Sequence, residues 1–122
     1  MLKLSALPKT WIFDVDGTIV IHNGHLSPEG DRLLPGVQEF FQTIPKHDLI
    51  VLITAREDKH KESLIKFLSE KQIRFDHLIS GAPTGERILV NDSKPSGLLT
   101  AFAINKERDA SLDLNVVIDE SL

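Results

Sequence analysis

A chain of 122 residues is long enough for one globular domain with a single core, so we expect one domain over residues 1–122. Its 41% hydrophobic and 26% charged residues are ordinary for a soluble protein, and no apolar run is long enough to cross a membrane. The net charge of −4 argues against a nucleic-acid partner, and the absence of cysteine excludes disulfides and thiolate chemistry. The first residues do not resemble a signal peptide, so we expect a cytoplasmic protein.

Strands and helices alternate along the first part of the chain. Residues 11–14, which are apolar as far as Phe13, predict a first strand, and the mixed residues 19–26 predict a short hairpin or flap after it. A short helix over 37–44 carries its apolar side chains on one face and ends at Pro45. The apolar run within 48–53 predicts a strand buried on both of its faces.

The same alternation continues in the second half. The clearest helical pattern covers 57–72, where Leu and Phe recur on one side and Lys and Glu on the other. Further strands are expected at 77–80, 86–91 and 100–104, and residues 106–122 show no clear period. The pattern predicts an α/β fold, with a Rossmann-like parallel sheet of about five strands and helices on both faces.

The segment Asp14-Val15-Asp16-Gly17-Thr18 is the most specific chemical signal in the sequence. Two carboxylates at i and i+2 of a strand point to one side and repel each other. Such a pair persists where a cation or a reacting phosphate holds it together. The alternative is an ordinary Asp-rich turn, since Asp-Gly is also a turn signal.

Three polar residues, Asp14, Thr54 and Asp92, each follow a different predicted strand. Parallel sheets bind ligands beyond the carboxyl ends of their strands, so we expect the three to form one site. Asp14 would attack phosphorus and Asp16 would act as general acid and base. The Thr54 hydroxyl and the Ala55 N–H would bind phosphate, and Asp92 would add a ligand to Mg²⁺. Thr54 also suits a helix N-cap, and Asp92 an ordinary turn.

These segments resemble motifs one, two and four of the haloacid dehalogenase superfamily of phosphohydrolases. The resemblance rests on residues 14–18, on Thr54 after an apolar strand, and on Asn91-Asp92 after another. It implies a Mg²⁺-dependent phosphatase in which Asp14 is the nucleophile and Asp16 the general acid and base. Asp14, Asp92 and the Asp16 main-chain carbonyl would bind the metal. The short segments after the first and second strands imply that no cap domain is present.

The third motif of that family departs from the pattern in this chain. Its lysine neutralises the nucleophile and the phosphate, but residues 81–83 read Gly-Ala-Pro here. Losing this cation should impair catalysis, unless Lys94, Arg87 or Arg56 replaces it. Lys94 is the preferred candidate and would join the phosphate site. Each of the three also fits a solvated surface cation.

The sequence therefore predicts a cap-less phosphatase that hydrolyses a phosphate monoester through an aspartyl-phosphate, on a phosphosugar or another small phosphorylated metabolite. An open crevice would suit either a macromolecular substrate or a small one enclosed by a second subunit, as in a homo-oligomer. One alternative is a phosphate- or metal-binding protein without turnover, because Ala82 stands where a lysine is expected. Another is a receiver-like phosphoacceptor, against which Asp16 argues because it would hydrolyse the intermediate.

Overall fold

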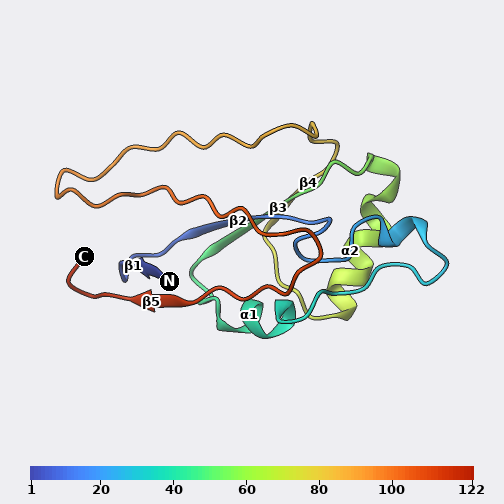
Figure 1. The fold of residues 1–122 in the computed structure, drawn as a ribbon, viewed down its shortest axis with the longest axis horizontal. Coiled ribbons are helices and arrows are strands. Elements are labelled where there is room, and N and C mark those ends of the chain that lie inside the picture. Colours follow the sequence, from blue (N-terminus) through green and yellow to red (C-terminus); the bar gives the residue numbers. More distant parts are fainter.

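A three-stranded parallel sheet carries the core of the molecule. In the computed structural model, which describes residues 1–122, this sheet has the order β2–β3–β4 (Figure 1). Its strands are β2 (Thr10–Asp14), β3 (Leu49–Ile53) and β4 (His77–Ile79). A separate two-stranded parallel sheet pairs β1 (Leu2–Leu4) with β5 (Val116–Ile118). The predicted α/β class with parallel strands is confirmed, but five strands divide between two sheets.

Each crossover between neighbouring strands of the larger sheet contains a helix. Helix α1 (Val37–Thr43) joins β2 to β3, and α2 (Lys61–Glu70) joins β3 to β4. Single turns of 3₁₀-helix, η1 (Gly24–Leu26) and η2 (Asp58–His60), precede them. The helices predicted at 37–44 and 57–72 are thus confirmed with shorter bounds. None of the helices has the length and apolar character that crossing a membrane requires.

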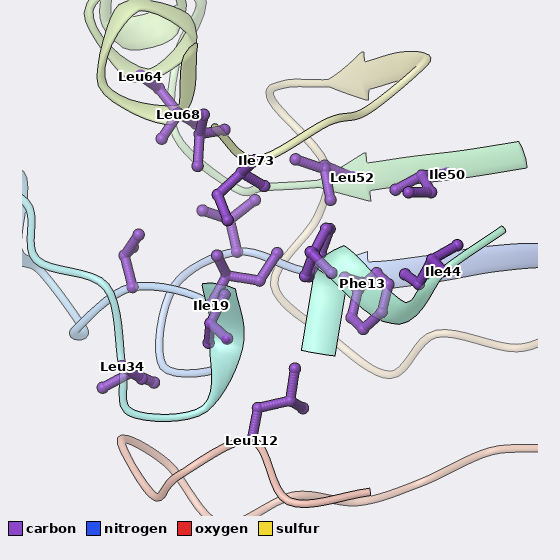
Figure 2. Close-up of a cluster of buried hydrophobic side chains, with 14 residues drawn as sticks. Phe13, Ile19, Leu34, Ile44, Ile50, Leu52, Leu64, Leu68, Ile73 and Leu112 are labelled. Carbon is purple, nitrogen blue, oxygen red and sulfur yellow. The ribbon is translucent and has the colours of Figure 1, made fainter. Parts of the chain in front are cut away.

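Both α-helices contribute to one hydrophobic core. The chain moves from β2 to β3 and then to β4 in the same direction across the sheet. Two right-handed crossovers of this kind place their helices on the same face of the sheet. Fourteen buried apolar side chains form a single cluster there (Figure 2), in which Phe13 of β2 and Leu52 of β3 meet Phe41 of α1 and Leu68 of α2. The expectation of helices on both faces is therefore wrong, because the strand order never reverses direction within this sheet.

The opposite face of the sheet has no helical cover. Its side chains alternate with those of the core, and Ile12 of β2 is 50% exposed and Ile79 of β4 is 49% exposed. Leu49 of β3 is 39% exposed, whereas its neighbour Ile50 is fully buried. The prediction that this strand is buried on both faces is corrected to burial on one face.

Residues 83–105 form a long excursion that we call the arm. It leaves the body after β4, runs outward, turns and returns as an extended strand-like pair of segments (Figure 1). The strands predicted at 86–91 and 100–104 are absent, although both segments have strand-like sequences. A sequence with β propensity becomes a strand only when an edge pairs with it, and neither segment of the arm pairs with a strand in this structure.

The returning chain completes the core after the arm. Leu112 is buried in the main cluster, and its N–H donates to the carbonyl of Pro35 at 2.9 Å. Gly36 begins α1 with a φ of +84°, and a Cβ there would collide with the Leu112 carbonyl oxygen. Glycine is therefore required at this position by both the left-handed backbone and the close approach of the returning chain.

Candidate functional site

Asp14 lies at the carboxyl end of β2 with its carboxylate partly open to solvent. Its side chain is 41% exposed, one carboxylate oxygen lies 3.8 Å from Arg87 Nη2, and the other accepts a long bond of 3.4 Å from Thr18 Oγ1. Burial raises the pKa of Asp14 above its ordinary value, and the nearby Asp16 carboxylate raises it further, while Arg87 and Thr18 oppose the shift. Asp14 is therefore a carboxylate with one weakly held cation.

Asp16, two residues on, has a different environment. Oδ1 accepts bonds from Arg56 Nε at 3.0 Å and Nη2 at 2.8 Å, and Oδ2 accepts one from Thr54 Oγ1 at 3.0 Å. The other side of the Arg56 guanidinium donates to Asp31 at 2.9 and 2.8 Å. The Arg56 side chain is only 3% exposed. Burial works to lower the pKa of Arg56, but the bonds to Asp31 and Asp16 raise it.

This network explains why two carboxylates can stand at i and i+2. The sequence predicts that a cation holds the pair together, and within the chain Arg56 supplies that cation for Asp16. The guanidinium is shared with Asp31, so the three residues together carry one net negative charge. Asp14 stays outside the network, which makes the two aspartates of the motif chemically distinct.

The residues predicted to bind phosphate lie in three different settings. Thr54 is buried, and its hydroxyl donates to Asp16 and accepts from the Arg56 N–H at 3.1 Å. The hydroxyl proton is therefore already used in a bond within the protein. Ala55 is exposed, and its N–H donates to no protein acceptor. Lys94 lies at the turn of the arm, where its N–H donates to Leu98. A free N–H directly after β3 leaves Ala55 as the candidate donor to an anion.

The structure separates the three cations that could replace the missing lysine. Arg87 lies beside Asp14, Arg56 is committed to Asp16 and Asp31, and Lys94 makes no ion pair. The geometry therefore favours Arg87 over Lys94, the candidate that the sequence favoured. A fourth cation was not singled out from the sequence: Lys106 Nζ donates to the Gly17 carbonyl at 3.1 Å. Only the return of the arm brings this residue to the motif, so no local signal marks it.

A cleft of about 780 Å³ separates the arm from β1 and β2. Roughly half of the residues that line the cleft are apolar. Its polar lining includes Asp14 and Thr18 on the side of the body. The arm and the chain that follows it contribute Asn91, Asp92, Lys94 and Lys106. Asp14 and Asp92 thus face the same space from different segments.

The predicted Mg²⁺ ligands are the carboxylates of Asp14 and Asp92 and the main-chain carbonyl of Asp16. No three His, Asp or Glu side chains lie close enough together to share a metal ion. The Asp16 carboxylate is taken by Arg56 and Thr54, and Asp92 lies on the arm, where its main-chain carbonyl accepts a bond from Thr100. Only Asp14 and Asp92 would contribute carboxylates to the ion, and Mg²⁺ binding by these residues stays a prediction.

The predicted flap contains a histidine beside the Arg56 network. Residues 19–26 form turns and η1 instead of a hairpin. The His25 ring stands edge-on to His60 at 4.9 Å, and its buried Nδ1 has no hydrogen-bond partner. Burial lowers the pKa of His25, and Arg56 lowers it further, so the ring is neutral at pH 7.

Comparison with known proteins adds evidence on the fold. No family model matches the chain, and no curated protein matches it. Among solved structures it is similar to a chain of the Pnkp1/Rnl/Hen1 complex, with 28% sequence identity and a TM-score of 0.52. The similarity covers 68% of this chain and 31% of that chain, so the present chain corresponds to a minor part of its neighbour.

Proposed function

We propose that this chain hydrolyses phosphate monoesters and that Asp14 is the nucleophile. The observation that carries the proposal is the contrast within the motif. The Asp14 carboxylate is partly exposed at a strand end, with Arg87 at 3.8 Å, while Asp16 is tied to Arg56 and Thr54. A nucleophile must be accessible, and a cation beside it offsets its repulsion from a phosphate. The likeness to a chain of the Pnkp1/Rnl/Hen1 complex supports the proposal at the level of the fold.

In the proposed reaction an Asp14 oxygen attacks phosphorus, and the bond from phosphorus to the ester oxygen breaks. The leaving oxygen takes a proton, and water then hydrolyses the aspartyl-phosphate to release phosphate and restore Asp14. Arg87 offsets the negative charge, and the free Ala55 N–H binds a phosphate oxygen. Asp14, Asp92 and the Asp16 main-chain carbonyl would hold Mg²⁺, which would supply further charge neutralisation at the phosphate.

Asp16 is the proposed proton donor and acceptor. Its oxygens are engaged by Arg56 and Thr54, so it can exchange a proton only when the guanidinium releases one contact. Asp31 holds the other side of that guanidinium at 2.8–2.9 Å and keeps Arg56 charged and in place while this happens. We therefore assign Arg56 and Asp31 a positioning role.

The proposed substrate is a phosphosugar or another small phosphorylated metabolite in the cytoplasm. The cleft of about 780 Å³ lies within the range of small-molecule sites. Its mixed polar and apolar lining suits a compact polar ligand, and Lys94 and Lys106 bring positive charge to it. The net charge of −4 disfavours a nucleic acid as substrate.

The test is phosphate release from p-nitrophenyl phosphate and a panel of sugar phosphates, with and without Mg²⁺. We expect Asp14→Asn to abolish release and Arg87→Ala to lower it by about tenfold or more. Asp113→Asn makes the same chemical change at an exposed position outside the site and should leave release unchanged. Full activity in the Asp14→Asn protein would contradict the assignment of the nucleophile.

Phosphate binding without turnover is a second candidate function. The engagement of Asp16 by Arg56 favours it, because that contact occupies the group needed to complete hydrolysis. Calorimetry with inorganic phosphate distinguishes the two: binding that Arg87→Ala weakens, together with no release from any ester, would favour the binding protein. A receiver-like module would instead retain a phosphoryl group on Asp14, which mass spectrometry of the intact protein would detect.

A further inference from the structure

The chain that returns from the arm passes the loop that follows β2 (Figure 1) and is bonded to it. The carbonyl oxygen of Gly17 accepts two bonds from the returning chain, one from the Asp109 N–H at 2.9 Å and one from Lys106 Nζ at 3.1 Å. Arg108 packs on the same glycine, since a Cβ at Gly17 would lie 3.1 Å from the Arg108 Cγ. Residues 106–109, which we call the return segment, therefore meet the motif at one peptide group.

Asp109 of the return segment also contacts the flap, residues 19–26. One oxygen of its carboxylate accepts a bond from the His22 N–H at 2.8 Å, across 87 residues of sequence. On its other side the flap is bonded to the chain before α1, where the Ile21 N–H donates to the Arg32 carbonyl at 3.0 Å. A single residue, Asp109, thus connects the motif loop through its main chain and the flap through its side chain.

The main chain of Asp109 has a conformation that favours glycine. Its φ is +61°, and it is the third residue of a turn in which the Ala110 N–H donates to the Glu107 carbonyl at 3.2 Å. Glycine adopts a positive φ without steric cost, whereas an aspartate adopts it at some cost in free energy. The turn by itself therefore does not call for a carboxylate. The bond to His22 gives a reason for one, and strained residues of this kind cluster at functional sites.

The peptide group that the return segment holds lies next to the contact that orients Asp14. Gly17 is followed by Thr18, whose hydroxyl donates to the Asp14 carboxylate at 3.4 Å. Lys106, Asp14 and Thr18 all line the cleft described above. The Lys106 ammonium donates to two main-chain carbonyls, of Gly17 at 3.1 Å and of Glu107 at 2.9 Å, so its position is fixed by the main chain on both sides.

We propose that Asp109 and Lys106 are positioning residues, which hold the Gly17–Thr18 peptide and the flap so that Asp14 is presented to the cleft. We call their bonds to Gly17 and His22 the clamp. The role of the clamp in catalysis rests on the proposed function, whereas its role in ordering the flap does not. A small displacement of a nucleophile lowers the rate of the chemical step strongly, so loosening the clamp should lower kcat more than it raises KM.

The first test measures hydrogen exchange of the flap by NMR and needs no enzymatic activity. Asp109→Gly keeps the turn and the N–H that bonds Gly17 but removes the carboxylate, so the His22 amide should exchange at least about tenfold faster. Asp109→Asn keeps an acceptor oxygen and should exchange like the native protein. Asp113→Gly removes an exposed carboxylate near the return segment and should leave the His22 amide unchanged. Native exchange at His22 in the Asp109→Gly protein would overturn the clamp.

The second test measures phosphate release from p-nitrophenyl phosphate by the same variants. Asp109→Gly and Lys106→Met should each lower kcat by about tenfold and change KM by less than about twofold, while Asp109→Asn should retain the native kcat. A native kcat in the Asp109→Gly protein, or an equal loss in the Asp109→Asn protein, would overturn the positioning role. If the native protein releases no phosphate while the His22 amide still responds to Asp109→Gly, the proposed function fails and the clamp stands.

Discussion

The body and the arm of this protein each contain a short apolar segment of similar sequence, but the two segments have different structures. The segment Ile50-Val51-Leu52 of β3 and the segment Ile88-Leu89-Val90 of the arm are both short runs of branched apolar residues. The first lies between β2 and β4 and buries Ile50 and Leu52 completely, while the second is exposed and unpaired. The difference shows that strand propensity becomes a strand only where neighbouring edges and a packed face are provided.

Hydrogen exchange gives the largest expected contrast between the two regions. In dilute solution, amides of β3 should exchange at least about a thousandfold more slowly than those of residues 88–92, since the latter open without breaking a main-chain bond. Mass spectrometry of peptides from both regions measures this, and equal protection of the two regions would contradict the contrast.

Removing the guanidinium at the centre of the site should destabilise the body strongly. Arg56→Met leaves the carboxylates of Asp16 and Asp31 without their shared cation, which we expect to lower the free energy of unfolding by about 3–5 kcal/mol. Urea denaturation followed by circular dichroism measures it. Arg32→Met, at an exposed position, should change stability by no more than about 0.5 kcal/mol. A similar loss in both variants would show that the network is not specifically stabilising.

Truncation of the core tests the packed face of β3. Leu52→Ala removes a fully buried side chain from the main cluster, and we expect a loss of about 2–4 kcal/mol. The matched truncation Leu49→Ala lies on the uncovered face of the same strand and should cost well under half as much. The same denaturation experiment compares them, and equal losses would indicate that both faces are covered in solution.

The smallest expected effect concerns Asp14 and has the opposite sign. Folding raises the pKa of Asp14 above its unfolded value of 3.8. The free energy of unfolding is therefore highest below the unfolded pKa, where Asp14 is protonated in both states, and it falls as the pH rises through the folded pKa. At pH 7 without metal, Asp14→Asn should therefore stabilise the protein slightly, by less than about 1 kcal/mol because the carboxylate is partly exposed. The gain should vanish below pH 3.5; a constant gain at all pH values would exclude this cause.

Local patterns in the sequence were sufficient for much of the body. The apolar runs at β2 and β3 and the helical period of α2 depend on nearest neighbours along the chain, and all three elements are confirmed. The motif at residues 14–18 also identified a crowded pair of aspartates in need of a cation. These features are local in sequence, so they could be predicted without knowing how the chain folds.

Tertiary structure decided the features that depend on distant segments. Asp16 meets Arg56 across 40 residues, and Arg56 meets Asp31 across 25, so the partner of each charge could not be read from its neighbours. The same is true of residues 86–91, which have strand propensity but pair with no strand of the folded chain. Propensity and periodicity are properties of a segment, whereas pairing and charge compensation are properties of what the folded chain places beside it.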